Sequence, residues 1–205
     1  MAVQSTDPAV SIRKFRREVE EFRALAADYR RRGWFLLDAE YPRVSILATA
    51  PRLRPPAVVT GVLLDYSDYD LRPPSVRLVD PFTLEPYSMK DLPTALLRQV
   101  EVEAALPAGI QLPPGAQLAK MIQRQALMQA YGPDDIPFLC LAGVREYHEH
   151  PGHSGDAWEL HRTSGAGRLI RLIEVIDSYG VKPLSGYNVN LVPQIVGFAE
   201  NEVPA

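Results

Sequence analysis

The side chains best suited to metal binding or thiol chemistry lie close together in this sequence. The chain has a single cysteine, Cys140, and all of its histidines follow within the next 21 positions: His148, His150, His153 and His161. Thiolate and imidazole are ligands that zinc selects, and short spacings let one loop or hairpin supply several of them. The same groups can also serve as a nucleophile and its base. The segment therefore predicts one shared chemical site.

A hairpin is the local structure that would bring these side chains together. If Gly143 centres a three-residue hairpin loop, Cys140 lies opposite Glu146 on the same face, and His148 is the diagonal neighbour of Cys140. Pro151-Gly152 can then turn the chain back toward the site. On this geometry the predicted zinc ligands are Cys140, Glu146, His148 and His153, with His150 in reserve.

Other residues of the segment have weaker or different roles. Glu149 would point away from Cys140 in a regular strand, and His161 reads as an exposed residue. Asp156 is a candidate hydrogen-bond acceptor for a ligand imidazole. A cysteine in the apolar run Phe138-Leu-Cys-Leu can also be no more than a small buried hydrophobe.

Composition bounds the class of protein. The chain of 205 residues has 46% hydrophobic and 23% charged residues, which is typical of one soluble globular domain spanning 1–205. A net charge of −3 argues against a dedicated nucleic-acid binder. A single cysteine cannot form an internal disulfide, and no stretch approaches a membrane span. We expect a cytoplasmic protein that does not bind membranes.

The first part of the chain predicts a helix laid on a sheet. Asp7 is a good N-cap, Pro8 suits the first helical position, and a 3- and 4-residue apolar spacing continues to about Arg32 before Gly33 ends the helix. Short aliphatic runs separated by turn residues then predict an antiparallel meander of four strands. These are Trp34–Leu37, Val44–Ala48, Val58–Leu64 and Val76–Val79.

The later part predicts an insertion and a closing helix. Apolar residues between Ser88 and Tyr131 indicate a mostly helical insertion over 88–131. Ile136–Leu141 returns to strand character, and Gly165–Tyr179 predicts a C-terminal helix with Gly180 as its C-cap. The expected fold class is α+β.

The order of these elements resembles the ubiquitin-conjugating-enzyme fold. A helix and a four-strand meander are followed by Tyr69-Asp-Leu-Arg-Pro-Pro74 before the fourth strand, then by Cys140-Leu141, Trp158 and a helix. In that family a Cys-Leu pair carries a thioester, so the resemblance implies that Cys140 is a transfer nucleophile. The His-Pro-Asn triplet that usually precedes the family's cysteine is missing here.

A second resemblance is more local. Cys140, Glu146, His148 and His153 are similar to the four residues that name the predicted metal-binding Cys-Glu-His-His family of bacteria. Glu149 fits the same letter order as Glu146. That family occurs in operons with multi-ubiquitin-like proteins, adenylating enzymes and deubiquitinase-like peptidases. The resemblance implies a role in bacterial ubiquitin-like conjugation, with a ubiquitin-like protein and its adenylating enzyme as partners.

Three functions remain open at this stage. The preferred one is a metal-binding accessory protein with about one zinc per chain, because the triplet is missing and three nearby histidines exceed what one activated thiol needs. The alternative is a conjugating enzyme that transfers a ubiquitin-like protein through a thioester on Cys140. The third is a non-catalytic adaptor in which the histidines are structural.

Overall fold

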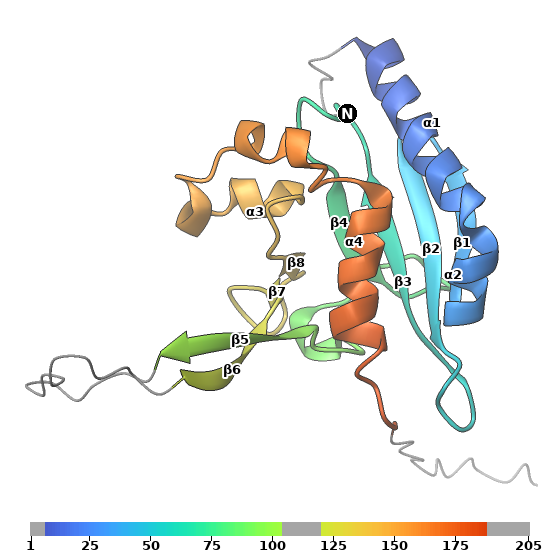
Figure 1. Cartoon of the computed structure of the whole chain (residues 1–205), viewed down its shortest axis with the longest axis vertical. Coiled ribbons are helices and arrows are strands. Elements are labelled where there is room, and N and C mark those ends of the chain that lie inside the picture. The colour runs from blue at the N-terminus through green and yellow to red at the C-terminus, as the bar shows by residue number, and fades with distance from the viewer. Residues whose placement is uncertain (1–6, 104–119, 188–205) are drawn as a thin grey trace, which may run out of the picture.

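The computed structural model describes residues 7–103 and 120–187. Its main body is a four-stranded antiparallel sheet in the order β1-β2-β3-β4 (Figure 1). The strands are β1 Trp34–Glu40, β2 Arg43–Ala50, β3 Ala57–Asp65 and β4 Ser75–Val79. The predicted α+β class and the four-stranded meander are confirmed, and each strand is longer than its sequence pattern indicated.

The predicted N-terminal helix is confirmed with one interruption. The Asp7 side chain accepts a hydrogen bond from the Ala9 amide at 2.9 Å and begins α1, Pro8–Ala24. Leu25 leaves helical geometry (φ −100°, ψ 9°), and α2 continues from Ala26 to Arg32. Gly33 ends it with φ +94°, where an added Cβ would lie 2.5 Å from the Thr49 carbonyl oxygen. Only glycine fits that turn.

The C-terminal helix is shorter than predicted. Helix α4 spans Leu169–Ile176, because Gly165 adopts φ +75° and breaks the helical path before it can begin there. After Ile176 the chain continues as the π-helical turn η5, Asp177–Val181, so Gly180 lies inside a turn and is not a C-cap. Helices α1 and α4 lie across the same sheet (Figure 1) and are joined where the Leu169 amide donates to the Glu18 carboxylate at 3.2 Å.

The core lies between these helices and the sheet. Buried aliphatic and aromatic side chains from α1, the sheet and α4 belong to one hydrophobic cluster. Its fully buried members include Trp34, Ile46, Leu64, Leu172 and Ile173. Burial of apolar area on this scale is the main stabilising contribution to the fold.

The mostly helical insertion over 88–131 is wrong for the described residues. These form the short helical turn η1 (Met89–Asp91), an antiparallel hairpin of β5 (Leu97–Glu103) and β6 (Lys120–Ala126), and β7 (Met128–Gln129). Positions 104–119 lie outside the described residues. The hairpin extends away from the body (Figure 1), and Met121 and Ile122 of β6 are 53% and 71% exposed. Their apolar spacing therefore reflects no buried helix face.

A lobe of short elements lies beside β4 (Figure 1). Strand β8, Phe138–Leu139, pairs with β7 and is shorter than the predicted Ile136–Leu141. Next come α3 (Arg145–Glu149) and the 3-10 turns η2 (Pro151–His153), η3 (Trp158–Leu160) and η4 (Arg162–Ser164). Within the described ranges, no helix has the length and apolar character needed to cross a membrane.

Candidate functional site

Cys140 lies directly after β8, where the lobe meets the β5–β6 hairpin. Its amide donates to the Leu127 carbonyl at 2.7 Å, and the Leu127 amide donates to the Leu96 carbonyl at 2.9 Å. The free thiol is partly buried. Burial raises the pKa of Cys140, and the positive charge of Arg98 opposes that rise. The thiol therefore needs a base before it can act as a nucleophile at neutral pH.

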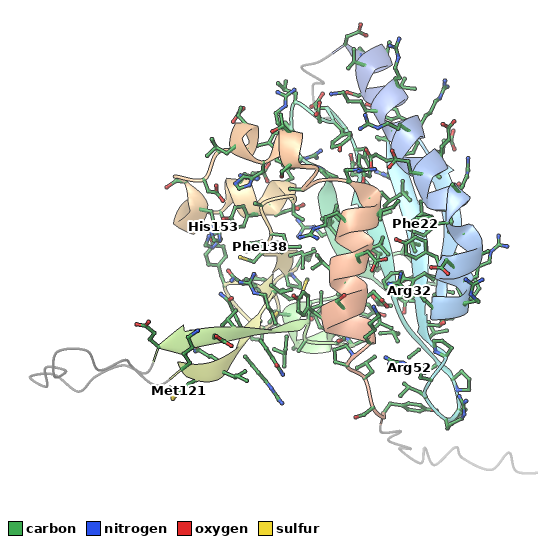
Figure 2. All side chains as sticks on the ribbon, in the orientation of Figure 1. Phe22, Arg32, Arg52, Met121, Phe138 and His153 are labelled. Carbon is green, nitrogen blue, oxygen red and sulfur yellow. The ribbon has the colours of Figure 1, made fainter. Side chains whose placement is uncertain are left out.

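His153 is the candidate base beside the thiol. Its Nε2 lies 3.4 Å from the Cys140 Sγ. The turn η2 places it there: Pro151 opens the turn, and the Gly152 amide donates to His150 Nδ1 at 3.1 Å. The Tyr147 ring stacks on the His153 ring with centroids 3.9 Å apart and fixes its plane. His153 lies on the side of α4 away from α1 (Figure 2).

The predicted hairpin opposite Cys140 does not form. Residues 145–149 are the helix α3, anchored where the Arg145 amide donates to the Pro74 carbonyl at 2.9 Å. Side chains two apart point in different directions on a helix, so Glu146 and His148 do not share a face with Cys140. The strand geometry used to rank the ligands was wrong.

The acidic candidates both pair with arginines. Glu146 accepts from the Ser75 hydroxyl and lies 3.1 Å from the Arg77 guanidinium, both on β4. Its side chain is only 12% exposed, so this is a largely buried pair. Glu149 forms a surface pair with Arg72. The second carboxylate oxygen of Glu146, Oε2, is buried without a hydrogen-bond partner among the described residues.

His148 holds the lobe together. Its Nδ1 lies 2.8 Å from the Asp156 carbonyl oxygen, and its Nε2 lies 2.7 Å from the Ala142 carbonyl oxygen. Both ring nitrogens are engaged with backbone, so His148 is not available as a ligand in this conformation. It fastens the two ends of the segment that carries His153.

His150 and His161 are placed around the pair. The His150 ring packs 5.5 Å from the His153 ring and also contacts Tyr131 and Phe138. His161 Nε2 lies 2.5 Å from the Asp156 carboxylate. His150 is therefore an aromatic neighbour of the site, and His161 binds Asp156 rather than Cys140.

Tyr147 and Asp156 form a polar link that sequence reasoning missed in part. The Tyr147 hydroxyl donates to Asp156 at 2.6 Å. This hydrogen bond, with burial, raises the pKa of Tyr147 to about 12, and it also lowers the pKa of Asp156, helped by His161. Asp156 was expected to support a ligand imidazole, but its side chain supports Tyr147 and His161. Tyr147 directly precedes His148, and this position within the histidine-rich segment is the sequence feature that could have indicated its role.

Geometry in the described parts of the chain does not assemble a zinc site of the predicted composition. No three histidine, cysteine, aspartate or glutamate side chains there are grouped so that they could hold one ion. Of the predicted ligands, only Cys140 and His153 have donor atoms in contact. Zinc content stays a prediction.

The loop between β3 and β4 supports the lobe. Arg145 reaches it through the Ser67 carbonyl at 2.7 Å, and Trp158 Nε1 donates to the Asp70 carbonyl at 2.9 Å. On the other side Gly143 packs so closely that an added Cβ would lie 2.1 Å from the Ala166 carbonyl oxygen. These contacts fix the turn that follows Cys140.

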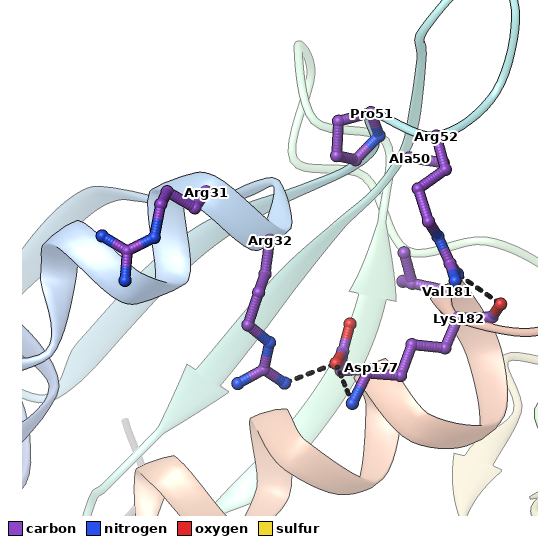
Figure 3. Close-up of a pocket in the computed structure, with 8 residues that line it drawn as sticks. All are labelled: Arg31, Arg32, Ala50, Pro51, Arg52, Asp177, Val181 and Lys182. Atoms are coloured by element: carbon purple, nitrogen blue, oxygen red, sulfur yellow. Dashed lines mark hydrogen bonds and ion pairs between the residues drawn. The ribbon is translucent and has the colours of Figure 1, made fainter.

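A basic pocket lies at the C-terminal end of α4. It has a volume of about 210 Å³, and Arg31, Arg32, Arg52 and Lys182 line it together with Asp177 (Figure 3). Asp177 accepts from Arg32 and, at 3.1 Å, from Lys182. The same carboxylate accepts from the buried Trp34 Nε1 at 2.9 Å. These partners indicate a structural junction.

Comparison with known proteins adds family membership. The sequence profile of the Y4jH family matches residues 6–184. A protein of Sinorhizobium fredii (strain NBRC 101917 / NGR234), named uncharacterized protein y4jH, is 40% identical over 194 residues. That alignment covers 92% of this chain and 91% of the relative. The chain that brings Cys140 and His153 together therefore belongs to the Y4jH family.

Proposed function

We propose that Cys140 is a nucleophile that carries an acyl group as a thioester, with His153 as its base. The observation behind this proposal is the 3.4 Å separation of Sγ and Nε2, in a site where His148 binds two backbone carbonyls and Glu146 binds Ser75 and Arg77. A thiol whose pKa is raised by burial needs such a base, and a neighbouring imidazole can accept its proton.

The pathway proposed is ubiquitin-like conjugation. A helix on a four-stranded antiparallel meander, with the cysteine between the fourth strand and a later helix, is the element order of ubiquitin-conjugating enzymes. A ubiquitin-like protein and its adenylating enzyme are the proposed partners. This assignment rests on resemblance in element order and in the Cys140-Leu141 pair.

The proposed step is a thioester exchange. His153 takes the proton of Cys140, and the thiolate attacks the thioester carbonyl of the loaded donor enzyme. A new sulfur–carbon bond forms at Cys140, the donor's sulfur–carbon bond breaks, and the donor thiolate takes up a proton. Stacking on Tyr147 holds the imidazole in place for this transfer.

A metal-binding accessory function is the second candidate. Two ligands of a tetrahedral zinc ion, at ~2.3 Å for sulfur and ~2.0 Å for nitrogen, lie about 3.5 Å apart, so the Cys140–His153 pair also suits zinc. Further ligands would have to come from rearranged side chains or from a partner, because His148 and Glu146 face carbonyl oxygens and arginine. This requirement favours thiol chemistry.

The test is formation of an adduct at Cys140. The tag-free protein is incubated with ATP, a bacterial ubiquitin-like protein and its adenylating enzyme, and resolved without reductant. We expect an adduct that reductant cleaves in the wild type and a longer-lived ester in Cys140→Ser. No adduct, together with one tightly bound zinc per chain, would support the accessory function instead.

A further inference from the structure

A second pocket lies beside Cys140 and differs in character from the one at Asp177. It has a volume of about 210 Å³ and lies between the base of the β5–β6 hairpin and α4. Leu127 and Leu141 line it, and these are the acceptor of the Cys140 amide and the next residue in the chain. Cys140 does not line the pocket itself, but both of these backbone neighbours do, so the pocket lies close to the residue that carries the thiol.

Two guanidinium groups stand beside apolar side chains in its wall. Arg98 of β5 and Arg171 of α4 both line the pocket, with Val175 and Tyr179 beside them. The positive charge of Arg98 acts on Cys140, where it opposes the rise in the thiol pKa caused by burial. A cation in a largely apolar pocket is a strong attractor for an anionic group.

Neither guanidinium is neutralised by an acid in the described part of the chain. Arg98 Nε is buried there without a hydrogen-bond partner, and its terminal nitrogen donates only to the neutral amide of Gln125. Arg171 is exposed, and no described residue forms a hydrogen bond or ion pair with it. A buried donor without an acceptor costs free energy, so Arg98 Nε would gain from an acceptor that enters the pocket.

The acid in the pocket wall is already engaged. Glu174 accepts two hydrogen bonds from Arg32, at 2.6 and 2.8 Å, and one from the Tyr29 hydroxyl at 2.9 Å. It leaves the charge of Arg98 and Arg171 unbalanced. The pocket thus presents net positive charge to a group approaching Cys140.

We propose that this pocket is a carboxylate-binding subsite for the peptide segment that delivers the acyl group to Cys140. The identity of the peptide rests on the proposed function, whereas the preference for an anion near the thiol does not. The volume is below the roughly 300 Å³ at which drug-sized ligand pockets begin, which suits one acidic side chain.

The single cysteine makes the test direct, because every thiol adduct of this chain is an adduct of Cys140. Iodoacetate and iodoacetamide alkylate the thiolate in the same way: the sulfur–carbon bond forms and iodide leaves. One reagent carries a carboxylate and the other a neutral amide. The ratio of their rates, measured by intact mass at one pH, therefore reports anion binding and cancels the protonation state of the thiol.

We expect Arg98→Gln and Arg171→Gln each to lower the iodoacetate-to-iodoacetamide ratio by roughly three- to tenfold, an effect that weakens with added salt. Arg98→Lys should keep most of the ratio. The matched control is Arg124→Gln, which removes the same charge from the same hairpin but pairs with Gln99, on the face opposite Arg98. Its ratio should stay within about twofold of wild type.

An unchanged ratio in both arginine variants would overturn the subsite, as would an equal fall in Arg124→Gln. If Arg98→Gln fails to fold, the exposed Arg171 still decides the outcome. The two proposals can fail separately. A preserved charge preference without any Cys140 adduct removes the acyl-transfer function and leaves the anion subsite, and the reverse pattern removes only the subsite.

Discussion

Replacing Asp177 tests how α4 is held against the rest of the fold. The Asp177 side chain is 2% exposed and accepts hydrogen bonds from Arg32 and Lys182 (Figure 3). It also accepts one from Trp34 Nε1. These partners come from β1, α2 and the end of the π-turn. Asp177 directly follows α4, so its carboxylate ties the end of that helix, whose Arg171 lines the pocket near Cys140, to β1 and α2.

The magnitude follows from what each partner loses in Asp177→Ala. Trp34 is 0% exposed, so its orphaned N–H costs about 1–3 kcal/mol. Arg32 keeps Glu174, and Lys182 is 51% exposed, so together they add about 1 kcal/mol. The sum is a loss of about 2–4 kcal/mol in the free energy of unfolding, or roughly 5–15 °C in Tm for a chain of this size.

Asp177→Asn separates charge from hydrogen bonding. The amide oxygen can still accept from Trp34, so we expect a loss of only about 1–2 kcal/mol. Burial alone would raise the pKa of Asp177, but the hydrogen bonds from Arg32, Trp34 and Lys182 outweigh it, and the pKa is lowered. A lowered folded pKa stabilises the protein above the unfolded pKa, and this stabilisation is lost as pH falls through the folded pKa. The difference in the free energy of unfolding between wild type and Asp177→Asn should therefore shrink as the pH is lowered.

Urea unfolding measures these differences as shifts of the midpoint at constant m-value. Asp28→Asn is the control, since Asp28 is 60% exposed and, among the described residues, forms an ion pair only with Arg31. It should change stability by at most about 1 kcal/mol. Equal effects of Asp177→Ala and Asp28→Asn would refute the reasoning.

Three further predictions concern the site. Gly143→Ala places a Cβ against the Ala166 carbonyl and should lower the free energy of unfolding by about 3 kcal/mol or more, measured by thermal unfolding. Gly155→Ala is the control and should be nearly neutral, because nothing lies within 4 Å of its added Cβ. Equal Tm values for the two variants would contradict the close packing at Gly143. Tyr147→Phe keeps the ring stacked on His153, so the rate of Cys140 alkylation should stay within about twofold of wild type. Tyr147→Ala removes the ring and should slow alkylation more than Tyr147→Phe does. Equal slowing by both variants would assign the effect to the hydroxyl. Elemental analysis of tag-free protein should find clearly less than one zinc per chain. If the wild type instead holds one zinc per chain, and both Cys140→Ala and His153→Ala lose it, the pair is a metal site.

The sequence predicted the main body well because its signals were local. A capping aspartate, a proline at the first helical turn and an αL glycine bounded the first helix, and alternating aliphatic runs between turn residues marked the four strands. Each signal acts within a few residues, so no tertiary knowledge was needed.

The errors arose where tertiary contacts decide. The apolar residues of β6, including Met121 and Ile122, are exposed on a hairpin, so their helical spacing carried no information about burial. Residues 145–149 form a helix whose first residue, Arg145, donates its amide to the Pro74 carbonyl, some 70 positions earlier in the chain. No local pattern reveals that contact.

Of the residues predicted to share one site, the structure brings the donor atoms of only Cys140 and His153 together. Clustering of the histidines after Cys140 identified the lobe, and His153 does contact the thiol. The carbonyl partners of His148 and the arginine partner of Glu146 depend on how the lobe folds back on β4. A count of ligand types cannot show which of them are already engaged.

The central claim is that Cys140 and His153 act as a pair. Its most direct measurement is the pH dependence of Cys140 alkylation by iodoacetamide in wild type and in His153→Gln, followed by intact mass. We expect the wild type to react at least about tenfold faster than His153→Gln near pH 7, because the imidazole takes the thiol proton, and the two rates to converge at alkaline pH, where the thiol ionises unaided. Identical profiles in the two proteins would contradict the claim and leave Cys140 as a half-buried thiol that happens to lie beside a histidine.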